Sequence, residues 1–281
     1  MKKLRVNKKT VLVTAVATAA LTAFSLWQNN DITVSNYEYK SDKINKALDG
    51  YKIVQISDLH NKQFGKGQSR LLTEIKALSP DIIVITGDIV DCRRTDINPA
   101  LDFVTGAVKI APVYYVSGNH EELLSLYDAK RLKDGIKQAG AKILINCAVN
   151  IEHGGESFCL LGVKDGSETD DLKQLLYTLD SPHNFKVLLA HKPQYLNSYS
   201  ENSIDLVFSG HAHGGQARLP FIGGLIAPEQ GLFPKYSAGE YVMDDTTMIV
   251  SRGLGNSIIP VRVSNRPDIV VVELKSVEWG D

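Results

Sequence analysis

The sequence has little cysteine and no excess of positive charge over most of its length, and each deficit excludes a class of protein. Its 281 residues contain only Cys92, Cys147 and Cys159, and no two of them form a CxxC pair. Three scattered cysteines make neither a disulfide framework nor a cysteine-rich zinc module, so we expect small buried thiols. Five of the 31 basic residues lie in the first 30 positions, which leaves 26 basic against 32 acidic residues elsewhere. A domain with this balance is a poor partner for phosphate backbones, and we expect no nucleic-acid binding.

The composition is otherwise that of an ordinary folded domain. Hydrophobic residues make up 43% of the chain, and neither a repeat nor a low-complexity tract is present. The length is sufficient to bury one sizeable core or two small ones.

The N-terminal region is apolar and differs from the rest of the chain. Residues 11–27 carry no charge, and as a helix they would reach about 25 Å, the short end for crossing a hydrocarbon core of about 30 Å. The basic residues of segment 1–10 precede them, which by the positive-inside rule keeps that tail in the cytoplasm. We therefore expect a transmembrane signal anchor in the cell membrane and an extracytoplasmic catalytic domain. A cleaved signal peptide, giving a secreted protein, remains the alternative.

The pattern of apolar and polar residues in the rest of the chain indicates a linker and lead-in, residues 28–49, followed by a folded domain, residues 50–275. Within the domain, five apolar runs rich in β-forming residues are each followed at once by polar residues. The runs are residues 51–57, 81–86, 112–117, 185–190 and 204–209.

Helical patterns lie between these runs. Residues 68–79 place leucine and isoleucine on one face before Pro80, and residues 121–139 behave similarly before Gly140. Strands that alternate with helices predict an α/β layered fold, in which functional residues gather beyond the carboxyl ends of the strands. All five polar clusters follow predicted strands, so they can meet in one place.

The polar residues at these strand ends are of types that bind metals. They are Asp58, His60, Asp88, Asn119, His191, His211 and His213. Each motif alone is typical of a turn or a cap, but the ordered set has enough ligands for two metal ions. Carboxylate and imidazole suit manganese, iron and zinc, whereas calcium prefers more oxygen and copper(I) prefers sulfur.

The order of these motifs resembles that of the calcineurin-like metallophosphoesterase superfamily over roughly residues 50–275. The matching motifs are Asp58-x-His60, Gly87-Asp88, Gly118-Asn119-His120-Glu121, His191 and Gly210-His211-x-His213. The tail 251–274 is similar to that of an exported or membrane-anchored bacterial branch, akin to UDP-2,3-diacylglucosamine pyrophosphatase-like phosphoesterases. The resemblance implies a four-layer αββα sandwich with two divalent metal ions between its sheets.

The resemblance also implies a role for each matching residue. Asp58, His60 and His213 would hold the first metal, and Asn119, His191 and His211 would hold the second. Asp88 would bridge the two metals. His120 would be the catalytic histidine that binds no metal and would protonate the leaving oxygen, while a metal-bridging hydroxide attacks phosphorus in line.

The expected function is hydrolysis of a phosphodiester or pyrophosphate bond, in a lipid-linked or a nucleotide substrate. A phosphomonoesterase acting on nucleotides or phosphoproteins stays open, because the metals contact only the phosphoryl group. A non-catalytic scaffold that binds a protein partner is disfavoured, because every expected ligand and His120 are present.

Four residues and one loop receive more ordinary interpretations. We expect His153 in an exposed hairpin and His183 in a loop, and neither as a ligand. Asp91 and Glu121 follow ligand positions, where a supporting hydrogen bond and an exposed or capping role are equally open. Segment 217–236 is apolar and rich in glycine and proline, and we expect it to pack against the core. The alternative is a loop beside the site that contacts lipid or an acyl substrate.

Overall fold

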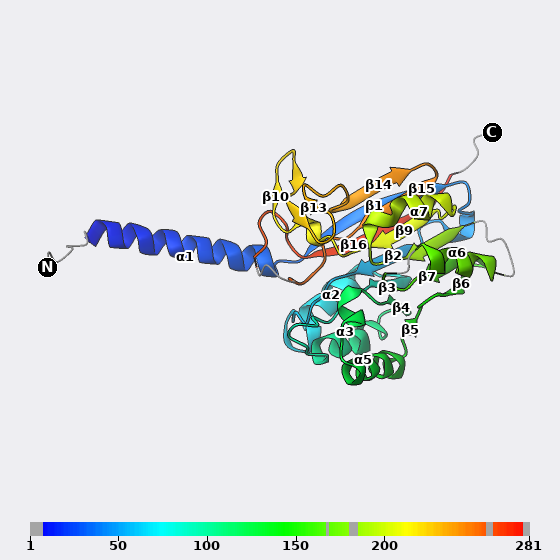
Figure 1. Ribbon diagram of the computed structural model, residues 1–281, viewed down its shortest axis with the longest axis horizontal. Coiled ribbons are helices and arrows are strands. Elements are labelled where there is room, and N and C mark those ends of the chain that lie inside the picture. The colour runs from blue at the N-terminus through cyan, green and yellow to red at the C-terminus, as the bar shows by residue number, and fades with distance from the viewer. Residues whose placement is uncertain (1–7, 167–168, 180–184, 257–260, 278–281) are drawn as a thin grey trace.

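The computed structural model describes residues 8–166, 169–179, 185–256 and 261–277. Two six-stranded sheets face each other, and helices cover the outer face of each (Figure 1). The predicted four-layer αββα sandwich is confirmed.

The first sheet has the strand order β1-β16-β2-β3-β4-β5. Its strands are β1 (Thr33–Ser41), β16 (Asp268–Ser276), β2 (Lys52–Ile56), β3 (Ile82–Thr86), β4 (Val113–Val116) and β5 (Lys142–Ile143). Strands β2 to β5 are parallel to one another, with Ile56 opposite Ile85. Their carboxyl ends therefore lie at one edge of the sheet.

The second sheet has the order β14-β15-β9-β8-β7-β6. Its strands are β14 (Gly239–Met243), β15 (Thr246–Val250), β9 (Leu206–Ser209), β8 (Lys186–Leu189), β7 (Glu156–Gly162) and β6 (Cys147–His153). Strands β7, β8, β9 and β15 are parallel, so their carboxyl ends also share an edge.

The helices lie close to where the sequence predicts them. Against the first sheet pack α2 (Ser69–Ala77), α3 (Asn98–Ala107) and α5 (Leu126–Ala139), and against the second α6 (Asp170–Tyr177) and α7 (Leu196–Glu201). The helix expected over 121–139 is divided, because α4 (Asn119–Glu122) ends and a new helix begins where the Ser125 hydroxyl accepts from Asp128 N–H at 3.1 Å. Single 3₁₀ turns are η1 (Lys46–Leu48), η2 (Lys66–Gln68), η3 (Pro193–Tyr195) and η4 (His213–Gly215).

Alternating side chains of each strand belong to different cores. In β3, Ile83 and Ile85 face the helices, whereas Ile82 and Val84 pack between the sheets. Both faces of the central strands are thus buried, which explains their nearly continuous apolar sequence. The packed sheets hold their loops at one edge, where the polar clusters lie.

The N-terminal helix α1 (Lys8–Asn30) projects away from this body (Figure 1). It is long and apolar enough to cross a membrane, and Gln28 is its one buried residue. The lead-in 28–49 contains β1, which pairs with β16 along its whole length, so the sheet begins before residue 50.

The expectation that segment 217–236 packs against the core holds only in part: Ala227 and Tyr236 join the core of the second sheet, whereas most of the segment lies outside it. It forms two short hairpins, β10 (Arg218–Leu219) with β11 (Gly223–Gly224) and β12 (Ile226–Ala227) with β13 (Gly231–Leu232). Several of their apolar side chains are exposed, and Phe221 is fully so. Main-chain pairing inside each hairpin, with bonds from Arg218 N–H to the Val263 carbonyl and from Leu225 N–H to the Gly215 carbonyl at the base, lets the segment extend outward.

The remaining predictions have mixed outcomes. His153 ends β6 in a hairpin and is exposed, as expected, with its ring against Tyr51. Cys159 is buried as predicted, but Cys92 and Cys147 are only half-buried. His183 lies outside the described residues.

Candidate active site

The structure brings together the polar residues that follow five strands. Asp58 and His60 follow β2, and Asp88 follows β3. Asn119 and His120 begin α4 directly after β4. From the second sheet, His191 follows β8, and His211 and His213 follow β9. Around Asp88 the ligand atoms form two clusters; Asn119 is half-buried, and the other members are nearly or fully buried.

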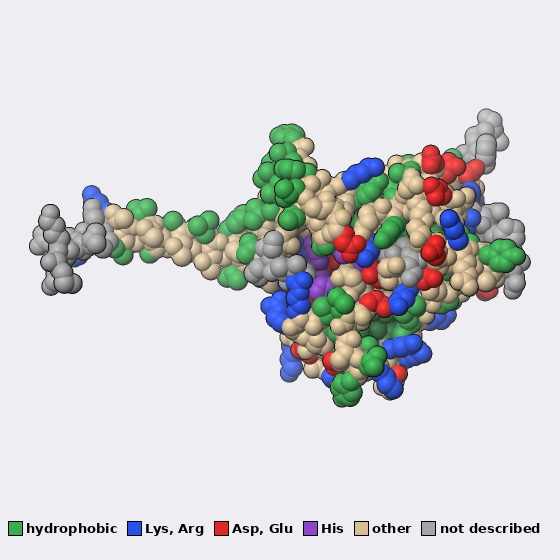
Figure 2. Space-filling view, in the orientation of Figure 1, with side chains coloured by type: hydrophobic (Ala, Val, Ile, Leu, Met, Phe, Trp, Pro, Cys, Tyr) green, Lys and Arg blue, Asp and Glu red, His purple; other side chains and the backbone are tan. Residues whose placement is uncertain are grey.

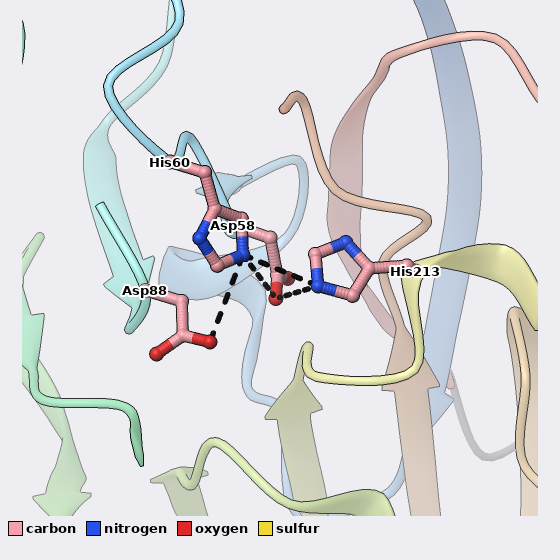
Figure 3. Close-up of side chains that lie close together, drawn as sticks. All are labelled: Asp58, His60, Asp88 and His213. Atoms are coloured by element: carbon pink, nitrogen blue, oxygen red, sulfur yellow. Dashed lines mark hydrogen bonds and ion pairs between the residues drawn. The ribbon is translucent and has the colours of Figure 1, made fainter. Parts of the chain in front are cut away.

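The first cluster contains Asp58, His60, Asp88 and His213, which point toward one another (Figure 3). The Nε2 atom of His60 lies 3.2 Å from His213 Nε2, 3.9 Å from Asp58 Oδ1 and 3.7 Å from Asp88 Oδ2. His213 Nε2 is 3.5 Å from Asp58 Oδ1. Two imidazole nitrogens and two carboxylates therefore face a common point.

The second cluster is centred on His191. Its Nε2 atom lies 3.2 Å from each of three atoms: His211 Nδ1, Asn119 Oδ1 and Asp88 Oδ2. His211 Nε2 points elsewhere, 3.8 Å from Glu229 Oε1. In this cluster too, nitrogen and oxygen atoms that can accept hydrogen bonds face one another, and they outnumber the donors.

Asp88 belongs to both clusters through one atom, Oδ2. Its other oxygen, Oδ1, accepts the backbone N–H of His120 at 2.8 Å. Burial alone would raise the pKa of Asp88, but His191 and His60 outweigh it and hold that pKa well below the usual range. The carboxylate is therefore negative at neutral pH and lies where two cations could share it.

The ring of His191 has a fixed orientation. Its Nδ1 atom lies 2.7 Å from the backbone carbonyl oxygen of Thr86, which can only accept, so Nδ1 carries a proton. Nε2 then turns toward the cluster. Burial acts to lower the pKa of His191, but the neighbouring Asp88 raises it well above the usual value.

The three other histidines of the two clusters, His60, His211 and His213, are neutral at neutral pH. Burial lowers the pKa of His60 to about 4 and of His211 to about 3, and it lowers that of His213 well below its usual value. Neutral imidazole is the form that binds metals.

The backbone at the site is strained. Asp58, His60, Asp88, His211 and His213 all have positive φ, between 46° and 66°. Side-chain-bearing residues rarely adopt this conformation, and its occurrence at several places in one site is typical of functional geometry. Gly210 adds a close approach, because a Cβ there would lie 1.9 Å from Ser57 Oγ and 2.5 Å from Asp58 Oδ2.

His120 lies beside the first cluster, with its ring edge-on to His60 at 4.5 Å between centroids. The backbone N–H of Cys92 donates to His120 Nδ1 at 3.2 Å, which leaves the proton of the neutral ring on Nε2. Asp91 Oδ1 lies 3.5 Å from the same nitrogen. His120 can therefore hold and release a proton at the edge of the site.

Glu121 is buried and supports the loops that carry the ligands. Its carboxylate accepts the backbone N–H groups of Asp88 at 2.7 Å, Val90 at 3.1 Å and Gly118 at 2.8 Å. Burial, with the charge of Asp88, raises its pKa to about 8. Of the two roles left open for Glu121, the structure favours the supporting one. Asp91 is buried too; its Oδ1 accepts the backbone N–H of Arg93 at 2.9 Å and lies 3.5 Å from His120 Nδ1.

One supporting residue was missed from the sequence. The Nδ2 atom of Asn265, on the loop before β16, donates to the carbonyl oxygens of His213 at 2.7 Å and Gln216 at 3.1 Å. Its own backbone N–H donates to Gln28 Oε1 in α1 at 3.3 Å. The sequence signal was only an asparagine near the end of the domain, which is too weak to single out.

The donor set fits divalent metal ions. Imidazole nitrogens, carboxylate oxygens and one amide oxygen are ligands shared by manganese, iron and zinc. The histidine and aspartate ligand atoms within each cluster lie within 4.8 Å of one another, and their backbone is fixed by the sheets. Two packed sheets with this paired site define a metal-dependent hydrolase.

Comparison with known proteins identifies the family. The model of the calcineurin-like phosphoesterase family matches residues 51–215, which contain all seven residues of the two clusters and His120. The chain belongs to this family and is a metal-dependent phosphoester hydrolase.

Curated relatives agree with this assignment over most of the chain. The metallophosphoesterase YkuE of Bacillus subtilis is 30% identical and aligns with 87% of this chain and 86% of its own length. The phosphodiesterase YaeI of Escherichia coli is 27% identical, over 80% and 82%. A zebrafish transmembrane protein with a metallophosphoesterase domain is 27% identical, over 86% of this chain and 57% of its own.

Proposed function

We propose that the protein hydrolyses a phosphodiester or pyrophosphate bond with two divalent metal ions, of manganese, iron or zinc. The first would be held by Asp58, His60 and His213. Asn119, His191 and His211 would hold the second. One observation carries this proposal: Asp88 Oδ2 lies 3.7 Å from His60 Nε2 and 3.2 Å from His191 Nε2, so it belongs to both ligand sets.

Two such ions supply positive charge for the phosphoryl oxygens and lower the pKa of water. The protein's own residues position these groups and handle the proton. Asp88 fixes the spacing of the two ligand sets. The Thr86 carbonyl holds the His191 ring with Nε2 inward. His120, protonated on both ring nitrogens, would donate the Nε2 proton to the leaving oxygen, and Asp91, whose Oδ1 lies 3.5 Å from Nδ1, would stabilise that charged ring beforehand.

The helix α1 would be a signal anchor in the cell membrane, with the catalytic domain on the extracytoplasmic side. Its length, its apolar composition and the basic residues ahead of it support this topology. A cleaved signal peptide would instead release the domain. The zebrafish relative is named as a transmembrane protein, which supports membrane attachment.

The substrate would be a phosphate ester that is lipid-linked or a nucleotide. A lipid-linked substrate is favoured by the position of the site, since histidine side chains reach the surface close to the end of α1 (Figure 2). This position is also consistent with the membrane-anchored branch akin to UDP-2,3-diacylglucosamine pyrophosphatase-like phosphoesterases. The alternative, a phosphomonoesterase, would prefer phosphate monoesters to diesters.

The test uses the full chain in detergent, stripped of metal and reloaded separately with manganese, iron, zinc or magnesium. Hydrolysis of bis-p-nitrophenyl phosphate and of p-nitrophenyl phosphate would be measured, together with the metal content of each protein. Asp88→Asn should lose metal and at least about 100-fold of kcat/KM, since even outer partners of metal ligands contribute 10–100-fold. Asp134→Asn, an exposed carboxylate on α5, is the matched control.

Faster hydrolysis of the diester would support the proposed reaction, and a preference for the monoester would favour the alternative. An Asp88→Asn protein with two bound metals and full activity would overturn the proposed site.

A further inference from the structure

The paired hairpins at residues 218–233 expose a group of apolar side chains that no core covers. We call this segment the apolar protrusion. Its exposed side chains are Leu219, Phe221, Ile222, Ile226, Leu232 and Phe233, at 43% to 109% of full exposure. Scattered apolar residues are normal on a surface, but several on one projecting element indicate an interaction site. Figure 2 shows this element as a largely green projection.

The protrusion stands beside the end of α1, on the side of the body from which that helix leaves (Figure 1). The two are tied to the same loop, which precedes β16. Asn265 bonds both to Gln28 in α1 and to the Gln216 carbonyl at the base of the protrusion. In the same loop, the Val263 carbonyl accepts the N–H of Arg218 at 3.0 Å.

The end of α1 has further attachments to the body. Asn256 Nδ2 donates to Asn29 Oδ1 at 2.7 Å, and Arg266 forms an ion pair with Asp31 at 2.9 Å. The Arg266 guanidinium also stacks over the ring of Trp27 at 5.3 Å. Because α1 joins the body through these contacts, a membrane around α1 would meet the neighbouring surface at a set orientation.

The chemistry of the protrusion fits lipid better than a charged protein surface. Over residues 218–233 its charged residues are Arg218 and Glu229. Both turn toward the body: Arg218 donates to the Gly214 carbonyl, and Glu229 pairs with Lys192 at 2.9 Å. The outward surface is thus left to phenylalanine, leucine and isoleucine. Aromatic and aliphatic side chains without charge are suited to the boundary between headgroups and acyl chains.

We propose that the apolar protrusion is a second membrane contact, which inserts into the lipid interface beside α1. The proposal rests on the membrane anchoring of α1 proposed above. Together the two elements hold the mouth of the site against the bilayer, where the phosphate esters of lipid headgroups lie. The substrate class that fits this placement is a phosphodiester or pyrophosphate in a lipid headgroup.

The protrusion also reaches the site itself. Glu229, in the turn between β12 and β13, lies 3.8 Å from His211 Nε2 and accepts from Gln194 Nε2 at 2.9 Å. Insertion of the hairpins into lipid would therefore fix a carboxylate next to a proposed metal ligand. The Glu229 side chain therefore links the proposed lipid contact to the geometry of the site.

The test measures lipid contact directly and does not depend on catalysis. Phe221→Trp would be made in the full chain and placed in nanodiscs of phosphatidylcholine or of phosphatidylcholine brominated on its acyl chains. Tyr177→Trp is the matched control, because Tyr177 is 93% exposed on α6, at the end of the body away from α1 (Figure 1). The unsubstituted chain gives the emission of the native tryptophans, to be subtracted.

We expect brominated lipid to remove most of the emission added by Phe221→Trp and to leave that added by Tyr177→Trp unchanged. Added emission that is red-shifted and unquenched would overturn the proposal, since the protrusion would then lie in water. Blue-shifted but unquenched emission would also overturn it, since the side chain at position 221 would then be buried in protein and not in lipid. Because no substrate is used, failure here is distinguishable from failure of the proposed reaction.

Discussion

The Nδ1–H of His191 donates to the backbone carbonyl oxygen of Thr86 at 2.7 Å, which joins the end of a strand in one sheet to a loop of the other. A carbonyl oxygen cannot donate, so this bond determines which ring nitrogen is available to a metal. Hydrogen bonds of this kind orient histidine ligands in many metal sites.

The first prediction is that zinc perturbs Nε2 of His191 and leaves Nδ1 protonated. The chain has 7 histidines, so selective ¹⁵N labelling gives few signals, and His191→Gln identifies the one of interest. On titration with zinc, the Nε2 resonance should move while the Nδ1–H resonance persists and exchanges slowly. A zinc-induced shift at Nδ1 with loss of its proton would contradict the interpretation.

The second prediction concerns His120 as the proton donor. Replacement by glutamine should leave the metal content unchanged, because His120 belongs to neither ligand cluster around Asp88. General acid catalysis contributes about 10²–10⁴-fold. The loss in kcat should be large for an alkyl ester, whose leaving oxygen needs a proton, and small for a p-nitrophenyl ester, whose leaving group does not.

The matched control is His153→Gln, which changes an exposed histidine in the β6–β7 hairpin. It should alter neither ester's rate. Equal losses for the two esters in the His120→Gln protein would exclude a role in protonating the leaving group. Loss of metal would indicate instead that His120 supports the ligands.

Much of this site follows from local sequence, because each proposed ligand lies directly after a buried strand. Parallel strands of one sheet bring their ends to one edge whatever the details of packing, so the convergence of Asp58 and Asp88 was predictable. That His191 meets them depends on how the second sheet packs against the first. Other features depend on contacts between distant segments. Asn265 meets the His213 carbonyl across 52 residues, and no local pattern announces that bond.

The apolar protrusion shows where local pattern misleads. Apolar residues usually indicate burial, and segment 217–236 was expected in the core for that reason. That inference assumes that an apolar side chain either packs in a core or faces water. Next to a helix able to span a membrane, lipid is a second alternative, and composition alone does not distinguish it from a core.

The third prediction is that metal removal lowers the thermal stability of the protein. The clusters hold Asp58 and Asp88 almost without exposure, and burial raises the pKa of Asp58 to about 6. Bound cations would relieve this cost. A metal at 1,000 times its Kd adds about 4 kcal/mol per site, which corresponds to roughly 8–16 °C in Tm for a domain of this size class.

Differential scanning fluorimetry of chelated and reloaded protein would measure this change. Manganese or zinc should raise Tm, and the rise should shrink in Asp88→Asn, which lacks the shared carboxylate. Calcium should raise Tm less, because it prefers more oxygen ligands than these clusters offer. An equal rise in the variant would mean that metal stabilises the protein from another site.

The fourth prediction concerns the amide of Asn265, which supports a proposed ligand without contacting a metal. Its Nδ2 donates to the carbonyl oxygens of His213 and Gln216. Asn265→Ala removes both bonds, which should cost about 1–3 kcal/mol in the free energy of unfolding. Because the His213 backbone is then free to relax from its φ of 49°, metal affinity should fall by about 10–100-fold.

Asn265→Asp separates the donor's role from simple packing. It keeps the shape of the side chain but turns an oxygen toward two carbonyl oxygens, so it should be at least as damaging as alanine. Asn197→Ala, on α7, where the amide bonds only to exposed Glu201, controls for loss of an asparagine. Metal titration and denaturant unfolding would be measured for all three variants. Near-native metal affinity in Asn265→Asp would show that the backbone of His213 is held by the strands alone, and that the loop before β16 has no part in shaping the site.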